Sequence, residues 1–149
     1  AMAPTLRRGE VVLTNEFMYL FDRPKPCDVV LVTNPLSRTL FVRRVAGRGK
    51  DRVAIRNGEI FLNGGRLECF GVPLLPEEGK RGLPSYPETE IPEGHVFVLN
   101  DEVRLIPDSR QWGALPKTAV QAKVSQILIS RKGPRQQGDL DWERIGRSL

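Results

Sequence analysis

Histidine and cysteine are scarce in this sequence of 149 residues: His95 is the single histidine, and Cys27 and Cys69 are the two cysteines. They form neither a Cys-x-x-Cys pair nor a Cys/His cluster, which excludes the common zinc-site patterns. The sequence therefore predicts no metal and no cofactor. Two cysteines fit either one disulfide in an oxidising compartment or two reduced thiols, and both alternatives stay open.

Long apolar runs are also missing, because no stretch approaches the roughly 20 apolar residues of a membrane-spanning helix. No secretory leader precedes residues 1–4, AMAP, so we expect a piece cut from a longer protein. The net charge is +5, and the basic residues are scattered rather than gathered on one helix. This scatter disfavours nucleic acid as a partner. A solvated basic surface and attraction to anionic phospholipid headgroups both remain.

Glycine and proline, by contrast, are plentiful, with 14 and 12 residues, which favours a β-rich fold with many turns. The Asn57-Gly58 dipeptide between two β-rich runs predicts a hairpin over residues 52–62, since both residues accept a positive φ. Residues 71–92 lack periodicity and predict a long loop or a small insertion. Further short strands are expected at 11–13, 29–32, 40–45, 95–99 and 120–130. Together these patterns predict one mainly β domain, an antiparallel sheet or barrel over residues 1–132, followed by a polar tail, 133–149.

Four segments, in order, resemble the sequence boxes of type I signal peptidases. They are residues 2–6 with 9–12, MAPTL and GEVV; residues 24–30, PKPCDVV; residues 42–47 with Asp51 and 62–64, VRRVAG, D and LNG; and residues 91–101 with 108–113, IPEGHVFVLND and DSRQWG. The first and last boxes are specific in this order and spacing. The resemblance covers residues 1 to about 130 and implies the β-sheet or barrel domain of that family, with little helix.

The family uses a serine nucleophile and a neutral lysine base, and the resemblance places Ala1 at the serine and Arg43 at the lysine. A methyl group has no proton to lose and no lone pair to donate, so no acyl-enzyme can form at Ala1. Arginine keeps its proton in proteins and cannot act as a base. A buried Arg43 would also need a partner for its charge. We therefore expect Arg43 to turn outward or to pair with Asp101 or Asp108.

The fourth box departs from the family in two more places. Asn100 replaces a glycine, and Ile106 replaces a serine that neighbours the lysine. Asp108, Ser109 and Arg110 are retained, and we expect an Asp–Arg pair that holds a loop against the sheet. In the family, the extended substrate lies beside the strand that carries the lysine. The resemblance therefore implies a substrate groove formed by Met2, Leu40, Phe41 and Val42.

Two functional hypotheses follow from the resemblance. In the first, the chain is a non-catalytic binding module that holds a signal peptide or exported-protein segment by β-augmentation. In the second, it is an active signal peptidase whose nucleophile was changed to alanine in the laboratory, which accounts for Ala1 but not for Arg43, Asn100 and Ile106. A LexA-like repressor is disfavoured because no helix-turn-helix is visible.

The resemblance also implies an N-terminal membrane anchor, with this domain on the periplasmic or extracellular side of the cytoplasmic membrane. Residues 17–21, FMYLF, form an apolar cluster that fits either a core segment or strand, or a surface that dips into the bilayer interface.

Overall fold

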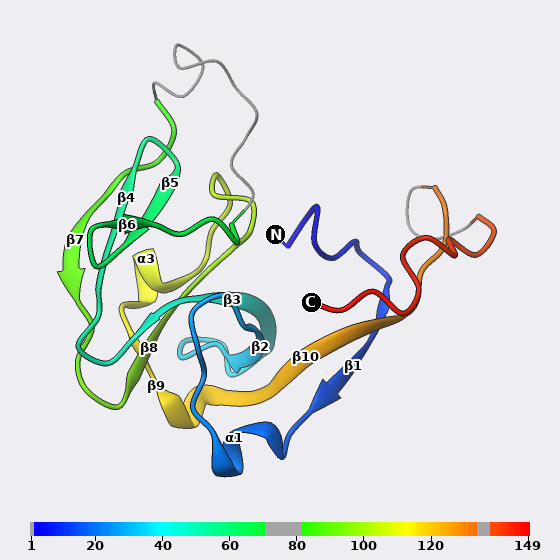
Figure 1. The fold of residues 1–149 in the computed structure, drawn as a ribbon, viewed down its shortest axis with the longest axis horizontal. Helices are drawn as coiled ribbons and strands as arrows, with labels where there is room; N and C mark the ends of the chain where they lie inside the picture. The colour runs from blue at the N-terminus through cyan, green and yellow to red at the C-terminus, as the bar shows by residue number, and fades with distance from the viewer. Residues whose placement is uncertain (1, 71–81, 134–137) are drawn as a thin grey trace.

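The computed structural model describes residues 2–70, 82–133 and 138–149. Two antiparallel sheets form the framework of this part of the chain (Figure 1). The larger sheet has the strand order β1-β10-β2-β3-β8-β9, and the smaller one has the order β6-β5-β4-β7. The predicted mainly β, antiparallel fold class is thus confirmed.

The strands of the larger sheet are β1 (Val11–Asn15), β2 (Val29–Thr33), β3 (Leu40–Arg48), β8 (His95–Leu99), β9 (Leu115–Pro116) and β10 (Val120–Ile129). Those of the smaller sheet are β4 (Arg52–Arg56), β5 (Glu59–Leu62), β6 (Gly65–Arg66) and β7 (Tyr86–Glu90). The helices within the described residues are the single turns α1 (Met18–Phe21) and α3 (Ser109–Trp112) and the 3-10 turn η1 (Lys117–Ala119).

The predicted hairpin at 52–62 is confirmed. β4 pairs with β5 in the register Arg56↔Glu59, so Asn57 and Gly58 form a two-residue turn. Both residues have positive φ, 48° and 79°, as a hairpin turn that follows the strand twist requires.

Three expectations need correction or qualification. The predicted loop 71–92 is wrong for residues 86–90, which form β7 at the edge of the smaller sheet; residues 71–81 lie outside the described residues. Of the alternatives for residues 17–21, the strand is excluded, because residues 18–21 form the helical turn α1. The polar tail does not extend freely into solvent, because its Asp141 and Arg144 are buried.

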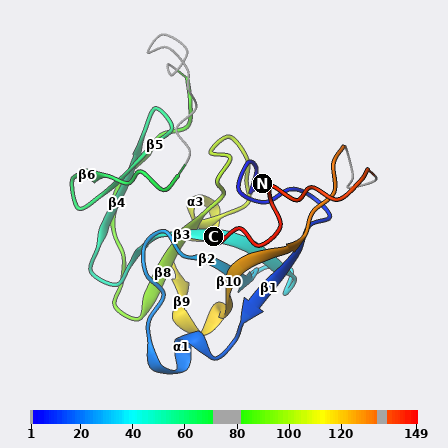
Figure 2. The same ribbon diagram turned by 45° about the vertical axis from the view of Figure 1, so that its right-hand side comes forward.

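The tail's described residues lie against β10 and the N-terminal segment, where Arg144 Nη2 donates to Thr5 O at 2.9 Å. The amide of Leu149 donates to Ser125 O at 3.0 Å, and Gln126 forms a β-bridge with Ser148. Leu149 packs in one cluster with Met2, so the start of the described chain and its C-terminus lie near each other in both ribbon views (Figure 2). The division at residue 132 stays a prediction.

Alternation along the strands separates the core of the larger sheet into two faces. One face carries a cluster that includes Val30, Val32, Val45, Val96 and Val98. The opposite face is covered at one end by Met2, Val29 and Val124, and at the other by a cluster shared with the smaller sheet that includes Phe70 and Phe97. β3 runs between these clusters, which places its arginines in the core.

Cys27 and Cys69 form a disulfide. It joins the turn before β2 to the segment that follows β6. Of the two alternatives that the sequence left open, the structure therefore has the disulfide and not two reduced thiols.

No helix within the described residues has the length and apolar character needed to cross a bilayer.

Candidate functional site

Two adjacent arginines on β3 define the candidate site. Arg43 and Arg44 are only 2% and 7% exposed, although they carry full charges in the middle of a sheet. Since neighbouring side chains of a strand point to opposite faces, Arg43 lies with Phe41 and Val45, and Arg44 lies on the face of Val42. The two cations therefore have separate surroundings.

Arg43 is held by backbone carbonyls rather than by carboxylates. Its Nε and Nη2 donate to Pro107 O at 3.1 and 2.7 Å, and its Nη1 donates to Val42 O at 2.6 Å. The guanidinium also lies over the rings of Phe41 and Trp112, with its Cζ 4.6 and 5.7 Å from their centroids. The expectation that Arg43 turns outward or pairs with Asp101 or Asp108 is wrong. Carbonyl dipoles and aromatic faces solvate the charge instead.

Burial lowers the pKa of the Arg43 guanidinium, and the negative charge of Asp108 opposes that shift. An arginine pKa begins so high that the group stays protonated in proteins. Arg43 can therefore donate hydrogen bonds at this position but cannot accept a proton from a nucleophile.

Arg44 takes the carboxylate that was expected for Arg43. Its Nε and Nη2 donate to the two oxygens of Asp101 at 2.7 and 2.9 Å, a bidentate pair with side-chain exposures of 8% and 2%. Its remaining donors bind Cys27 O at 2.8 Å and Thr5 Oγ1 at 3.0 Å. The pair ties β3, the end of β8 and the N-terminal segment together.

The sequence itself indicates that Arg44 needs a partner of its own, a point that the resemblance to the family does not bring out. Two successive arginines in the apolar run 40–47 place one charge on each face of a buried strand, and each needs its own partner. Asp101 was the right carboxylate, but it serves the neighbouring arginine on the other face.

The loop between β8 and α3 supplies the carbonyl that Arg43 binds. Asp108 caps α3 by accepting from Arg110 N at 3.1 Å, and its carboxylate accepts from Arg110 Nε and Nη2 at 2.9 and 2.7 Å. Arg110 also donates to the carbonyls of Val103 and Leu105. The geometry agrees with the expected Asp–Arg pair that holds a loop.

Asn100 and Ile106 lie in the same loop region with different surroundings. Asn100 is buried, and its Nδ2 donates to Leu105 O at 2.9 Å and to Asp108 Oδ2 at 3.2 Å. Its Oδ1 is buried without a hydrogen-bond partner. Ile106 is 56% exposed and offers no polar group. Asn100 therefore braces the loop, whereas Ile106 presents an apolar surface beside it.

The expected groove residues divide between the two faces of β3. Met2 and Val42 pack in one cluster and line a cavity of 330 Å³ together with Leu6 and Val12. Leu40 is 56% exposed and, two residues from Val42, shares its face. Phe41 lies on the opposite face against Trp112. Ala1 lies outside the described residues.

One edge of β3 at residues 40–42 is paired with β2 in the register Leu31↔Val42. The ladder between β3 and β8 begins only at Arg44↔Leu99. Among the described strands, none pairs with the second edge of residues 40–42. An added strand would find that edge beside the Met2 and Val42 cavity, and Val42 O could still accept a second hydrogen bond besides that from Arg43.

Within the described part of the chain, no three His, Cys, Asp or Glu side chains gather as metal ligands.

Comparison with known proteins agrees with this architecture. The family model "Signal peptidase, peptidase S26" matches residues 1–129. The chain is 30% identical over 130 residues to thylakoidal processing peptidase 1 of Arabidopsis thaliana, which covers 78% of this chain and 36% of that protein. It is 28% identical over 127 residues to the probable signal peptidase I-1 of a Synechocystis strain, covering 78% of this chain and 61% of that protein.

Among solved structures, a signal peptidase I from Enterococcus faecalis matches with a TM-score of 0.51 at 20% identity. The match covers 68% of this chain and 97% of that one, and it supports the shared fold. The chain thus spans between a third and two thirds of the length of the two curated relatives named above. On the family match over residues 1–129, the chain belongs to the signal peptidase, peptidase S26, family.

Proposed function

We propose that this chain is the extramembrane domain of a signal-peptidase-like protein that binds an extended signal-peptide or exported-protein segment without cutting it. One observation carries the proposal. Arg43, at the position of the family's lysine base, is buried and donates to Pro107 O and Val42 O. A guanidinium bound in this way has no lone pair with which to activate a nucleophile.

The groove supports the binding half of the proposal. Met2 and Val42 supply apolar lining to a cavity whose rim also includes Arg7, Arg8 and Glu10. Leu40 lies on the same face of β3, next to the unpaired edge of residues 40–42. An extended peptide gains main-chain hydrogen bonds at such an edge and places alternate side chains in the cavity. Small apolar side chains fit a shallow cavity of 330 Å³.

Two features support a membrane-attached domain on the periplasmic or extracellular side. The Cys27–Cys69 disulfide fits an oxidising compartment. Phe17 lies just before α1 and is 73% exposed, and Leu20 lies on α1 and is 68% exposed. Such exposure is expected of side chains that enter a bilayer interface. By contrast Tyr19, on the same turn, packs inward and donates to Asp28 at 2.8 Å.

The second candidate is an active signal peptidase whose serine was replaced by alanine. The two buried ion pairs near Arg43 favour this candidate, because the Arg44–Asp101 and Asp108–Arg110 pairs would also hold the site of a working enzyme in place. It requires, however, a base other than Arg43.

Restoring the dyad separates the two candidates. Ala1→Ser, Arg43→Lys and the double variant are expressed behind a membrane-spanning helix, with Ala3→Ser as the matched serine control. Each is assayed on a preprotein with an Ala-x-Ala site. The binding role predicts no cleavage by Ala1→Ser. Cleavage by Ala1→Ser alone would show an enzyme with an unforeseen base and would overturn the proposal.

Binding is measured directly with a labelled peptide that contains the same Ala-x-Ala segment. Leu40→Asp places a charge in the groove, while Leu36→Asp makes the same change at a side chain that is 83% exposed on the β2–β3 turn. We expect Leu40→Asp to weaken peptide binding by about tenfold or more and Leu36→Asp to leave it unchanged. A folded chain that binds no peptide would refute the binding role.

A further inference from the structure

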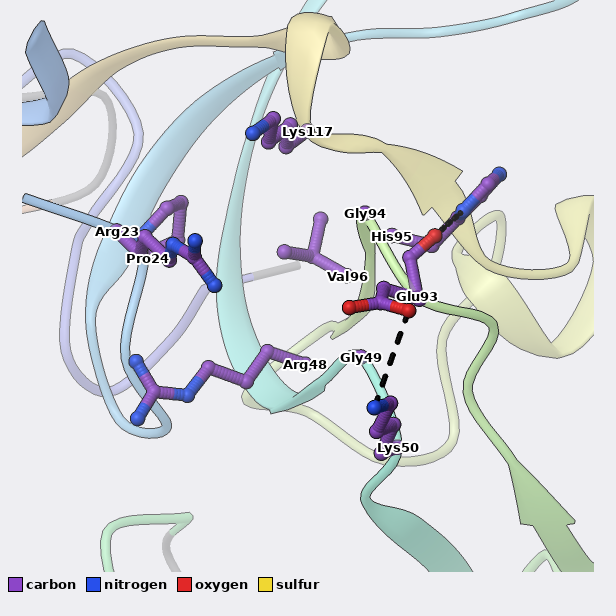
Figure 3. Close-up of a pocket in the computed structure, with 10 residues that line it drawn as sticks. All are labelled: Arg23, Pro24, Arg48, Gly49, Lys50, Glu93, Gly94, His95, Val96 and Lys117. Atoms are coloured by element: carbon purple, nitrogen blue, oxygen red, sulfur yellow. Dashed lines mark hydrogen bonds and ion pairs between the residues drawn. The ribbon is translucent and has the colours of Figure 1, made fainter.

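A second concave site lies away from Arg43. A pocket of about 530 Å³ is formed by the turn after α1, the turn between β3 and β4, the start of β8 and the residue that opens η1 (Figure 3). Four side-chain cations line it, against one carboxylate, Glu93. The cations are Arg23, Arg48, Lys50 and Lys117. They come from separate segments of the chain, so the fold gathers them rather than the local sequence.

Most of this positive charge is not compensated by the protein. Within the described residues, the side chains of Arg23, Arg48 and Lys117 make no ion pair or hydrogen bond. Lys50 Nζ lies 3.9 Å from Glu93 Oε2, with both side chains at least three-quarters exposed, so solvent screens that contact. The nearby Asp22, which also attracts Arg48, is bound to Lys25 at 3.0 Å. An anion in the pocket would relieve the repulsion among the four cations.

The walls of the pocket are fixed by backbone contacts. The amide of Lys50 donates to Ile91 O at 2.8 Å, and the amide of Lys117 donates to Gly94 O at 2.9 Å. Gly49 permits the close approach of the two turns, because a Cβ there would lie 2.9 Å from Glu93 Cα. Val96, 2% exposed, closes the floor. A pre-formed pocket loses less entropy on binding than a mobile one.

Lys50 occupies a backbone conformation that favours glycine. Its φ is 71°, in the left-handed region where a side chain is disfavoured. A lysine is nevertheless present and brings its amine to the pocket. A locally unfavourable residue at a concave charged site is a pattern associated with function.

We propose that this pocket binds a phosphate ester. Figure 3 shows Arg23 and Arg48 on one side, Lys117 on a second and Lys50 with Glu93 on a third, around Val96. Guanidinium groups bind phosphate oxygens in a bidentate manner, and ammonium groups add point charges. The volume lies within the range of small-molecule sites and exceeds what an isolated phosphate ion fills. A singly charged carboxylate would leave most of the cations unneutralised. The ester can come from a soluble metabolite or from a phospholipid headgroup.

The test uses the full chain and two kinds of probe. Glycerol 3-phosphate is titrated by calorimetry, and sedimentation is compared with vesicles of phosphatidylcholine alone and of phosphatidylcholine with phosphatidylglycerol. The triple variant Arg23→Gln, Arg48→Gln, Lys117→Gln removes three pocket cations. The control triple Arg38→Gln, Arg66→Gln, Lys132→Gln removes the same charge from exposed positions outside the pocket.

The pocket triple is expected to weaken binding by about tenfold or more in at least one arm, and the control triple by much less. A pocket-dependent signal with glycerol 3-phosphate identifies a soluble ester as ligand, and one confined to anionic vesicles identifies a lipid headgroup. Equal losses in the two triples would show a general surface-charge effect and overturn the proposal, as would the absence of binding in both arms.

Lys50→Gly provides a second, independent variant. It relieves the left-handed strain at φ 71°, so the thermal midpoint should stay the same or rise while phosphate-ester affinity falls. An unchanged affinity would remove Lys50 from the site and contradict the argument from its strain. Peptide binding at Leu40 is measured on the same variants, so failure of this proposal and failure of the peptide-binding role are distinguishable.

Discussion

Arg43 binds a single carbonyl oxygen, that of Pro107, with two donors: Nε at 3.1 Å and Nη2 at 2.7 Å. The contact joins the middle of β3 to the loop that precedes α3 across a sequence separation of 64 residues. Only a planar guanidinium can make this two-pronged contact and also lie over Phe41 and Trp112. Arg43, which the resemblance places at the family's lysine, therefore cross-links β3 to this loop.

Arg43→Lys should lower the free energy of unfolding by about 1–3 kcal/mol, because an ammonium cannot replace both hydrogen bonds and the ring contacts. Urea unfolding measures the change. Arg48→Lys, at the exposed end of the same strand, is the control and should shift stability by less than about 0.5 kcal/mol. Equal effects of the two substitutions would show that the contact with Pro107 adds little.

Asp101→Asn should cost more, about 3–5 kcal/mol, because it leaves the buried Arg44 cation without its counter-charge. The matched control is Glu88→Gln, which breaks the exposed Arg52–Glu88 pair at 3.5 Å and should cost less than about 1 kcal/mol. Chemical unfolding of the two variants side by side gives the comparison. A small loss for Asp101→Asn would mean that Cys27 O and Thr5 suffice to hold Arg44.

The Cys27–Cys69 disulfide closes a loop with a sequence separation of 42 residues. Loop-closure entropy for that length corresponds to about 4 kcal/mol, and measured values are often lower. The double variant Cys27→Ala, Cys69→Ala should therefore lose about 2–4 kcal/mol of unfolding free energy. A reductant should bring the unmodified protein to the variant's stability and leave the variant unchanged. Insensitivity of both proteins to reductant would contradict the pairing.

The sequence predicted best those strands whose ends are set by local turn residues. The Asn57-Gly58 turn follows from the backbone preferences of two residues. β7 was missed because Tyr86–Glu90 contains a proline and two glutamates, and such a segment is stable only as an edge strand paired on one side with β4.

The site was predicted in part for a related reason. Resemblance located Arg43 and Asp101, but a shift of one residue along a strand exchanges the two faces of the sheet. Asp101 therefore meets Arg44, while Arg43 meets Pro107 O. Which partner each arginine finds depends on the approach of loops more than fifty residues away, and no local pattern encodes that approach.

The C-terminal segment shows the same dependence on distant partners. Arg144 donates to Glu10 Oε1 at 2.6 Å and to Glu10 Oε2 at 3.1 Å, with side-chain exposures of 8% and 1%. Ser130 donates to the same carboxylate at 2.7 Å, and the backbone amide of Arg7 donates to it as well. Burial by itself would raise the pKa of Glu10, but these hydrogen bonds outweigh it and hold the pKa below its usual value.

This pKa shift predicts that the folded chain loses stability as the pH becomes acidic. The Glu10 carboxyl has a lower pKa in the folded chain than in the unfolded chain, where it is about 4.3. Its contribution is therefore fully present above that unfolded value and is lost as the pH falls through the folded pKa. Glu10→Gln, which does not titrate, should be less stable than the unmodified protein by about 1–3 kcal/mol near pH 7. This difference should shrink below about pH 4.3. Thermal unfolding of both proteins across this range tests it, with the exposed Glu143→Gln as control. A difference that stays constant with pH would show that the Glu10–Arg144 pair acts through shape and not through charge.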